Sequence, residues 1–294
     1  MGRKSNLTEE QIKDICNLYI QGKSSIEIAK IYNKTPSSIG GLLRRRNIPI
    51  RSNKQNSRKY FHNENYFETI DSEDKAYWLG FIYADGFITS KIQGEAQKLG
   101  ITLAAQDKHH LEKFKECIQA TNPIKTYKAS ISSCYNPNTI YSRILLSSQK
   151  LVDDIKDKGI VENKTNIIKF PTEKQVPKQL INHFIRGYLD GDGCISISHR
   201  TTRNIKIEFS IKILGTNDFL DGIKIFIENN TSIKINKYYL RKEYQTVKSL
   251  EFFGNKQVKN FLDLIYKDST IYLDRKYERY IQLCNYYNSR AYQE

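Results

Sequence analysis

The sequence predicts an α+β protein made of two similar halves that follow a small all-α region. Three observations carry this prediction. The stretch 77–86 returns as 184–193, so that Asp192 lies 107 residues after Asp85. After each copy, the apolar pattern gives the same order of strands and helices. Residues 1–50 instead show helical spacing alone, in three short segments.

Helix signals divide residues 1–50 into three parts. Thr8 and Gln11 predict a capping box for a first helix that stops at Gly22. Ser24 or Ser25 caps a second helix over 26–32. Thr35 and Pro36 open a third, because proline at the first helical position loses no hydrogen bond.

The third helix resembles the recognition helix of a helix-turn-helix unit, which enters the DNA major groove with its N-terminal polar residues. Its candidate DNA-binding residues are Ser37, Ser38, Arg44, Arg45 and Arg46. A small helical interaction module with a solvated basic end is the alternative. Gly40 and Gly41 fit poorly in either case, since glycine weakens a helix.

Charge favours a polyanion as partner. The net charge is +15 and the pI about 9.4, although the richness in Lys, Ile, Asn and Tyr also fits an AT-rich coding sequence. Residues 1–59 hold 13 Lys and Arg against 4 Asp and Glu. We expect residues 51–72 to form a basic linker that follows the DNA backbone, with Arg51 among its DNA-binding residues; disorder in the free protein is the alternative.

Several classes are disfavoured. No run of about 18 apolar residues and no apolar segment after Met1 is present, so we expect a cytoplasmic or organellar-matrix protein that is neither secreted nor membrane-bound. The five cysteines and five histidines lack metal-ligand spacing, which disfavours structural zinc and disulfides.

The two repeated stretches carry the chemistry. Each has two small residues four apart, Gly80 with Ala84 and Gly187 with Gly191, which lie on one helix face and permit close helix packing. Each then places an aspartate before a glycine, at the negative end of a helix dipole. Two such carboxylates side by side predict divalent cations, which offset the repulsion.

Both stretches resemble the signature of the LAGLIDADG homing endonucleases, in the single-chain form with two copies. The second copy departs from the pattern at Arg186 and Gly191, and the first at Tyr83. The resemblance implies a monomeric, site-specific endonuclease that uses Mg²⁺ or Mn²⁺ to cut both strands of double-stranded DNA, leaving 3′ overhangs. Asp85 and Asp192 would bind the metal, and no backbone ligand is assigned at Ala84. The implied role is mobility of an intron or intergenic element.

Residues 73–172 and 173–294 form the two halves, each predicted as αββαββα. Strands are expected at 87–89, 99–103, 125–131 and 141–146, and in the second half at 194–198, 205–213, 232–239 and 247–253. Helices are expected at 111–118, 151–158, 219–228 and 258–266. The resemblance joins the halves about a pseudo-twofold axis, with the sheets as a saddle on DNA.

The resemblance also implies basic and water-positioning residues. Lys164 and Lys276, with Arg275 possible, are the basic candidates; Gln106 or Asp107 and Thr216 or Asn217 would position water. Asp190, on the other side of its helix, is expected to be structural. In the strand 204–213 the isoleucines alternate with polar residues, which would face DNA or plain solvent. The DNA-binding candidates on the sheets are Arg143, Lys206, Lys212, Lys234, Lys237, Arg241 and Lys248.

Two other hypotheses stay open. The protein is a non-catalytic nucleic-acid binder, either an intron maturase or a transcription regulator, or the helix-turn-helix alone determines DNA affinity. The absence of an N-terminal Cys or Ser and of a final His-Asn disfavours an intein.

Overall fold

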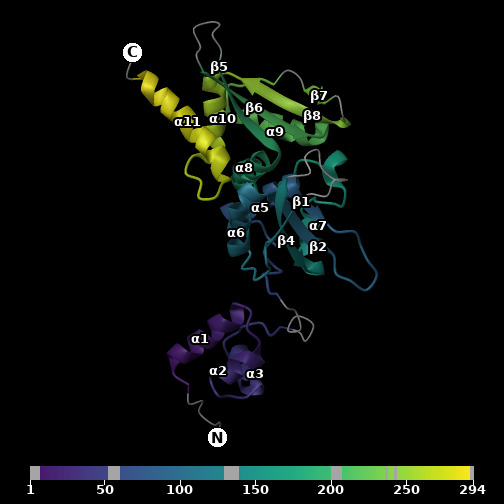
Figure 1. The fold of residues 1–294 in the computed structure, drawn as a ribbon, viewed down its shortest axis with the longest axis vertical. Coiled ribbons are helices and arrows are strands. Elements are labelled where there is room, and N and C mark those ends of the chain that lie inside the picture. Colours follow the sequence, from purple (N-terminus) through teal and green to yellow (C-terminus); the bar gives the residue numbers. More distant parts are fainter. Residues whose placement is uncertain are drawn as a thin grey trace. The chain divides into compact units, whose positions relative to one another are not determined.

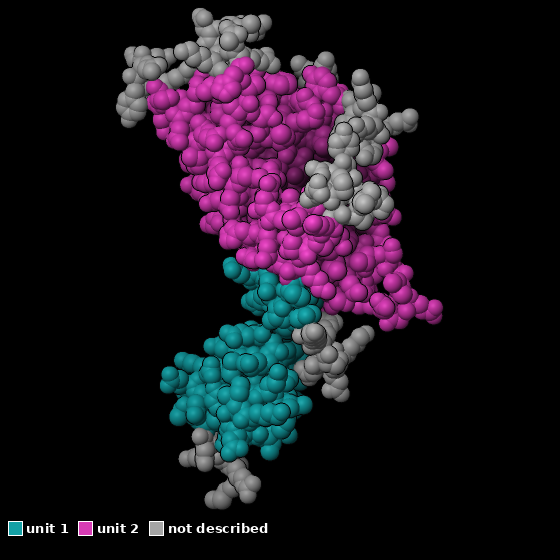
Figure 2. Space-filling model, in the orientation of Figure 1, with its two compact units in different colours: residues 1–63, 115–123 teal, residues 64–114, 124–294 magenta. Residues whose placement is uncertain are grey.

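The computed structural model describes residues 7–51, 60–128, 139–199, 207–235, 238–241 and 244–291. The chain divides into two compact units (Figure 2). Unit 1 comprises residues 1–63 and 115–123, and unit 2 comprises 64–114 and 124–294. In the ranges just given, no helix has both the length and the apolar character needed to cross a lipid bilayer.

Unit 1 contains the three predicted N-terminal helices, α1 (Glu9–Ile20), α2 (Ser25–Ile31) and α3 (Pro36–Arg45). Capping boxes fix the starts of the first two, because Thr8 pairs with Gln11 and Ser24 with Glu27. The apolar faces meet in one small core. The glycine pair lies inside α3, where a Cβ on Gly40 would touch nothing within 4 Å.

The expected linker 51–72 is too long, because its second part is folded. Residues 52–59 lie outside the described ranges. The Thr121 N–H donates to the Phe61 carbonyl at 2.8 Å, and the Phe61 N–H donates to Thr121 Oγ1 at 2.8 Å. Within unit 2, the side chains of Phe67 and Ile70 are buried. The segment after residue 60 is therefore folded, and its buried apolar residues belong to the core of unit 2.

The first half of unit 2 follows the predicted order (Figure 1). Its elements are α5 (Glu73–Asp85), β1 (Gly86–Ile88), β2 (Lys98–Ala104), the short helix η1 (Ala105–Asp107), α6 (Lys108–Cys117), β3 (Lys125–Lys128), β4 (Ile140–Ser147) and α7 (Gln149–Asp157). The strands form an antiparallel sheet in the order β1-β2-β4-β3.

The second half repeats this plan. Its elements are η2 (Lys164–Asn166), η3 (Lys178–Leu180), α8 (Ile181–Asp192), β5 (Gly193–His199), β6 (Ile207–Gly215), α9 (Asn217–Asn230), β7 (Tyr239–Arg241), β8 (Tyr244–Phe253), α10 (Asn255–Tyr266) and α11 (Asp274–Ala291). Its sheet has the order β5-β6-β8-β7, the counterpart of the first. The alternation predicted for β6 is confirmed, since Phe209, Ile211 and Ile213 are buried and Lys212 is exposed.

In the second half, the prediction of a strand at 232–239 is wrong for its first part, and one helix was missed. No strand covers 232–235, and β7 begins only at Tyr239. Ile233 and Ile235 alternate as in a strand, but their N–H groups donate to the side chains of Thr231 and Glu228 rather than to a neighbouring strand. Helix α11, of 18 residues, was not predicted.

Helices α5 and α8 pack against each other almost backbone to backbone. A Cβ on Gly80 would lie 2.0 Å from the carbonyl oxygen of Phe184, and one on Gly187 would lie 1.9 Å from that of Tyr77. No side chain fits at either place. The predicted close approach of the two repeats is therefore confirmed, and it brings the C-terminal ends of both helices together.

Buried polar groups also join these helices. The Arg186 guanidinium is fully buried and donates to the carbonyls of Ile265 and Ile271 and, at 2.6 Å, to the Glu73 carboxylate of α5. Asp190 is buried as well and accepts a 2.7 Å hydrogen bond from the Tyr77 hydroxyl. These contacts hold the register of α5 against α8.

Candidate active site and nucleic-acid interface

The two predicted carboxylates lie at the ends of the paired helices. Asp85 is the last residue of α5 and Asp192 the last of α8. A Cβ on Gly191 would lie 3.3 Å from Asp85 Oδ2, so the Asp85 carboxyl group touches the end of α8. Burial, and then the negative charge of Asp192, raise the pKa of Asp85 to about 6. The structure thus brings together two like charges that disfavour each other.

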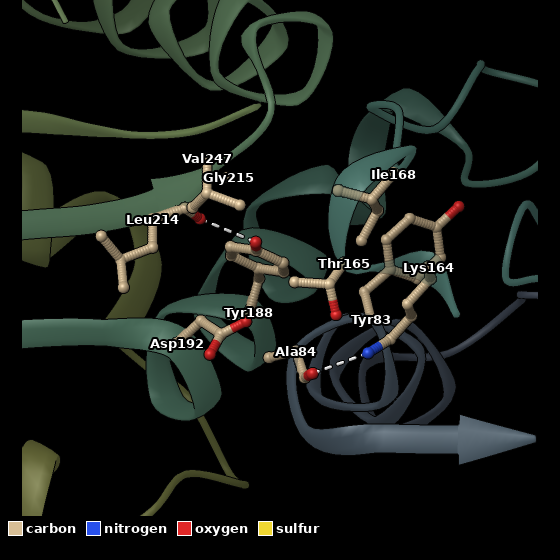
Figure 3. Close-up of a pocket in the computed structure, with 10 residues that line it drawn as sticks. All are labelled: Tyr83, Ala84, Lys164, Thr165, Ile168, Tyr188, Asp192, Leu214, Gly215 and Val247. Atoms are coloured by element: carbon tan, nitrogen blue, oxygen red, sulfur yellow. Dashed lines mark hydrogen bonds between the residues drawn. The ribbon is translucent and has the colours of Figure 1, made fainter. Parts of the chain in front are cut away.

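Lys164 stands beside this pair. It belongs to η2, and its Nζ donates to the Ala84 carbonyl at the C-terminal end of α5, at 2.8 Å. Burial lowers the pKa of Lys164, while Asp192 and Asp85 oppose that shift. The lysine and Asp192 line one cavity of about 180 Å³ together with Thr165 and Tyr188 (Figure 3). Among the described residues the Ala84 carbonyl is the one hydrogen-bond acceptor of Lys164 Nζ, which leaves two of its three ammonium hydrogens for a ligand in this cavity.

Lys276 takes the matching place in the second half but is bound differently. Its Nζ contacts four backbone carbonyls at the end of α8, those of Leu189 and Asp190 at 2.6 Å, Gly193 at 2.7 Å and Gly191 at 3.2 Å. Burial, only partly offset by Asp190, lowers its pKa to about 8. All three hydrogens are used by the protein, so Lys276 closes the helix end.

The other candidate residues near the site differ in the hydrogen bonds that they make within the protein. Arg275 donates to the Asp107 carboxylate at 3.1 Å, which ties α11 to η1. The Thr216 hydroxyl caps α9 and also donates to the Ile168 carbonyl. Of each predicted water-positioning pair, Gln106 and Asn217 are the exposed members. Asp190 hydrogen-bonds to buried tyrosines and to the Leu273 N–H, in line with the structural role expected for it.

The outward face of the first sheet carries Arg143. Its Nε donates to Thr102 Oγ1 at 2.8 Å, and its guanidinium lies over the rings of Tyr127 and Phe87, 4.8 and 5.4 Å from their centroids. Sequence reasoning missed both aromatic partners. The signal for Phe87 was its place two residues after Asp85, on the face opposite the buried Ile88.

The other predicted cations of the sheets fall in different environments. Lys212 is exposed on β6 but pairs with Glu251 at 2.7 Å. Lys248 lies near the start of α9, and Lys234 is exposed outside any strand. Lys206 and Lys237 lie outside the described residues, as does the side chain of Arg241.

Within unit 1, the predicted DNA-binding residues of α3 divide in the same way. Ser37, Ser38, Arg44 and Arg45 are exposed. Arg46 is exposed too, but its guanidinium contacts the Glu9 carboxylate at 2.7 Å. Arg51 donates to the carbonyls of Gly22 and Lys23 and covers the Tyr19 ring at 4.1 Å. It thus closes the three-helix unit, a structural role that the sequence did not suggest.

Comparison with known proteins gives matches of three kinds. Residues 179–266 match a family model described as a LAGLIDADG-like domain. A stretch of 108 residues is 30% identical to the probable translation initiation factor IF-2 of Methanocaldococcus jannaschii. That match covers 35% of this chain and 9% of the initiation factor, so the chain spans about a tenth of that relative.

Solved structures resemble the chain at low identity. The LAGLIDADG meganuclease I-AabMI bound to uncleaved DNA is 11% identical, with 74% of this chain and 91% of that chain covered and a TM-score of 0.48. The LAGLIDADG homing endonuclease I-GzeII in complex with its DNA target is 12% identical, with 77% and 94% covered and a TM-score of 0.48.

Proposed function

We propose that this chain, in which residues 179–266 form a LAGLIDADG-like domain, is a site-specific homing endonuclease. It would hydrolyse both strands of a long DNA target with a divalent metal and leave 3′ overhangs. The observation that supports this most is the pair Asp85 and Asp192, held side by side at the ends of two helices that pack backbone to backbone. Mobility of an intron or intergenic element is the role that fits such an activity.

The residues present fit Mg²⁺ or Mn²⁺. Asp85 is disfavoured as an anion by burial and by Asp192, and a divalent cation would relieve both effects. Among the described residues no group of three or more acidic, histidine or cysteine side chains could hold a metal. Mg²⁺ is commonly held by one or two carboxylates with water and substrate phosphate, so Asp85 and Asp192 suffice. When bound, the metal would supply Lewis-acid activation of water and of the scissile phosphate.

The chain's own groups would do the rest. Asp85 must be ionised to act, which requires a pH above about 6 in the metal-free protein. Lys164 would donate hydrogen bonds to a phosphate oxygen in its cavity and stabilise the charge that develops there. Lys276 would act on the second phosphate only through its charge, because its hydrogens are bound to carbonyls.

Double-stranded DNA is the proposed partner and a monomer the proposed form. The net charge of +15 supports binding to phosphates, and both carboxylates come from one chain. In unit 1, exposed Arg44 and Arg45 on α3 would add contacts to the DNA. Replacing both by alanine should weaken DNA binding and flatten its salt dependence by about two charges. Unchanged binding would remove α3 from the interface.

Cleavage of a randomised duplex library in Mg²⁺ tests the function. Wild type should give linear products with a shared sequence at the ends, and Asp85→Asn and Asp192→Asn should give none. Asp153→Asn is the matched control, since Asp153 is exposed on α7 and is not among the residues that line the cavity beside Lys164. Selective duplex binding without any cut by wild type would overturn the nuclease and favour the non-catalytic binder.

A further inference from the structure

The two sheets of unit 2 present unequal charge on their outward faces. On the first sheet, Lys98, Lys125 and Arg143 share the face opposite the core, and the described strands add no carboxylate to it. On the second sheet, the same face carries Glu208 and Glu251 beside Lys212. Lys212 is neutralised by Glu251 at 2.7 Å. Among the side chains that the structure describes on these two outward faces, the cations of the first sheet therefore have no carboxylate beside them, whereas Lys212 of the second sheet does.

Arg143 is the most tightly held of these cations. Three contacts fix the plane of its guanidinium: the Nε hydrogen bond to Thr102 and the flanking rings of Tyr127 and Phe87. Phe87 is itself fixed, because it covers Gly100, where a Cβ would lie 2.2 Å from the ring. Among the described residues, no partner is recorded for Nη1 or Nη2 of Arg143. Two parallel donors are thus left free in a fixed orientation.

A fixed pair of guanidinium donors matches one base edge in particular. In the major groove guanine presents two adjacent acceptors, O6 and N7, and arginine binds them with two parallel hydrogen bonds. Phosphate contacts need only a positive charge and tolerate flexible side chains. The clamp around Arg143 also lowers the entropy lost on binding. Its geometry fits base recognition better than attachment to the backbone.

At the three matching positions the second sheet carries different residues. By the register of the strands and the repeat, Ser249 takes the place of Arg143, Leu214 that of Thr102 and Cys194 that of Phe87. The Ser249 hydroxyl donates to Glu251 at 2.7 Å. None of the three can present a planar pair of donors.

We propose that Arg143 reads one guanine of the DNA target in the major groove, held for that purpose by Thr102, Tyr127 and Phe87, and that the half-site under the first sheet is read more stringently than the other. This inference rests on the proposed function in one respect only, which is that DNA lies on the sheets. It does not require cleavage.

Binding selection in the Asp192→Asn background tests it without any cut. A randomised duplex library should yield a site with one invariant guanine in one half. Changing that base should weaken binding about 10-fold or more for the parent protein and hardly at all for Arg143→Ala. Arg143→Gln should shift the preference at this position to adenine, and Arg143→Lys should keep affinity but lose selectivity. Thr102→Val should reduce selectivity partly.

Lys98→Ala and Lys125→Ala are matched controls on the same face. Each should weaken binding about equally for every sequence and lower the salt dependence by about one charge. The inference is overturned if Arg143→Ala behaves like these controls, or if the invariant base is unchanged in Arg143→Gln. A selective binder that never cuts would refute the nuclease alone, whereas cleavage with no guanine dependence on Arg143 would refute this inference alone.

Discussion

Lys164 and Lys276 hold matching places late in the two halves, but their ammonium groups are bound differently. Among the described residues, Lys164 Nζ has one hydrogen-bond acceptor, whereas Lys276 Nζ has four. Lys164 Nζ donates one hydrogen bond, to the Ala84 carbonyl at the end of α5, and the side chain also lines a cavity. Lys276 is surrounded by four carbonyls at the end of α8. The repeat places the carboxylates alike, while the basic group beside each follows from its own loop. A duplicated sequence motif thus does not guarantee two equivalent sites.

The largest loss of stability should come from substitutions at Gly80 and Gly187, where the two halves are alike. Gly80→Ala and Gly187→Ala would each drive a methyl group into the backbone of the other helix, at 2.0 and 1.9 Å. Each should destabilise the fold by more than about 3 kcal/mol, and by similar amounts. Thermal unfolding measures this. Gly40→Ala, where nothing lies within 4 Å, should instead stabilise by about 0.5–1 kcal/mol. Very different costs for Gly80 and Gly187 would contradict the symmetry.

Substitutions of the two lysines should differ in their effects: Lys276→Met should mainly lower stability, and Lys164→Met should mainly slow cleavage. Lys276→Met leaves buried carbonyls without a donor and should destabilise by about 2–4 kcal/mol. Lys164→Met loses one hydrogen bond, so its stability should change by less than about 1 kcal/mol, while cleavage of one strand slows about 100-fold. Unfolding and strand-specific nicking give the two readouts. Equal effects of both substitutions on both readouts would remove the distinction.

The repulsion between Asp85 and Asp192 can be tested through the dependence of protein stability on pH. Its folded pKa of about 6 exceeds the unfolded value of about 4, so the metal-free protein should lose stability as the pH rises from about 4 to 6. Asp85→Asn lacks this loss and should be more stable than wild type by about 2–3 kcal/mol at pH 7, with no difference near pH 4. Mg²⁺ at pH 8 should stabilise wild type more than the variant.

The smallest effect concerns the paired cation of the second sheet. Glu251→Gln would free Lys212 and should tighten DNA binding about 2- to 5-fold, with a steeper salt dependence. Asp153→Asn changes the net charge equally on α7 and serves as the control. If both variants bind alike, the pairing of Lys212 has no bearing on the interface.

The sequence predicted those parts of the fold that depend on residue spacing within one helix or strand. The Thr8 capping box, the alternation of β6 and the close packing at Gly80 all follow from spacing along the chain. The false strand at 232–235 shows the limit, since its N–H groups bind the side chains of Glu228 in α9 and of Thr231 just after it, which no periodicity reveals. The same holds for the site: the places of Asp85 and Asp192 were predictable, but the carbonyls around Lys276 and the rings around Arg143 depend on contacts between distant segments.

The contact between Gly80 and Gly187 also bears on how such a chain can change. Because backbone meets backbone there, the distance between the two helices that carry the carboxylates is set by the backbone at these glycines. Substitutions on one outward face leave that spacing, and the opposite sheet, as they are. If DNA lies on the sheets as proposed, we expect that a new target could be engineered one half at a time.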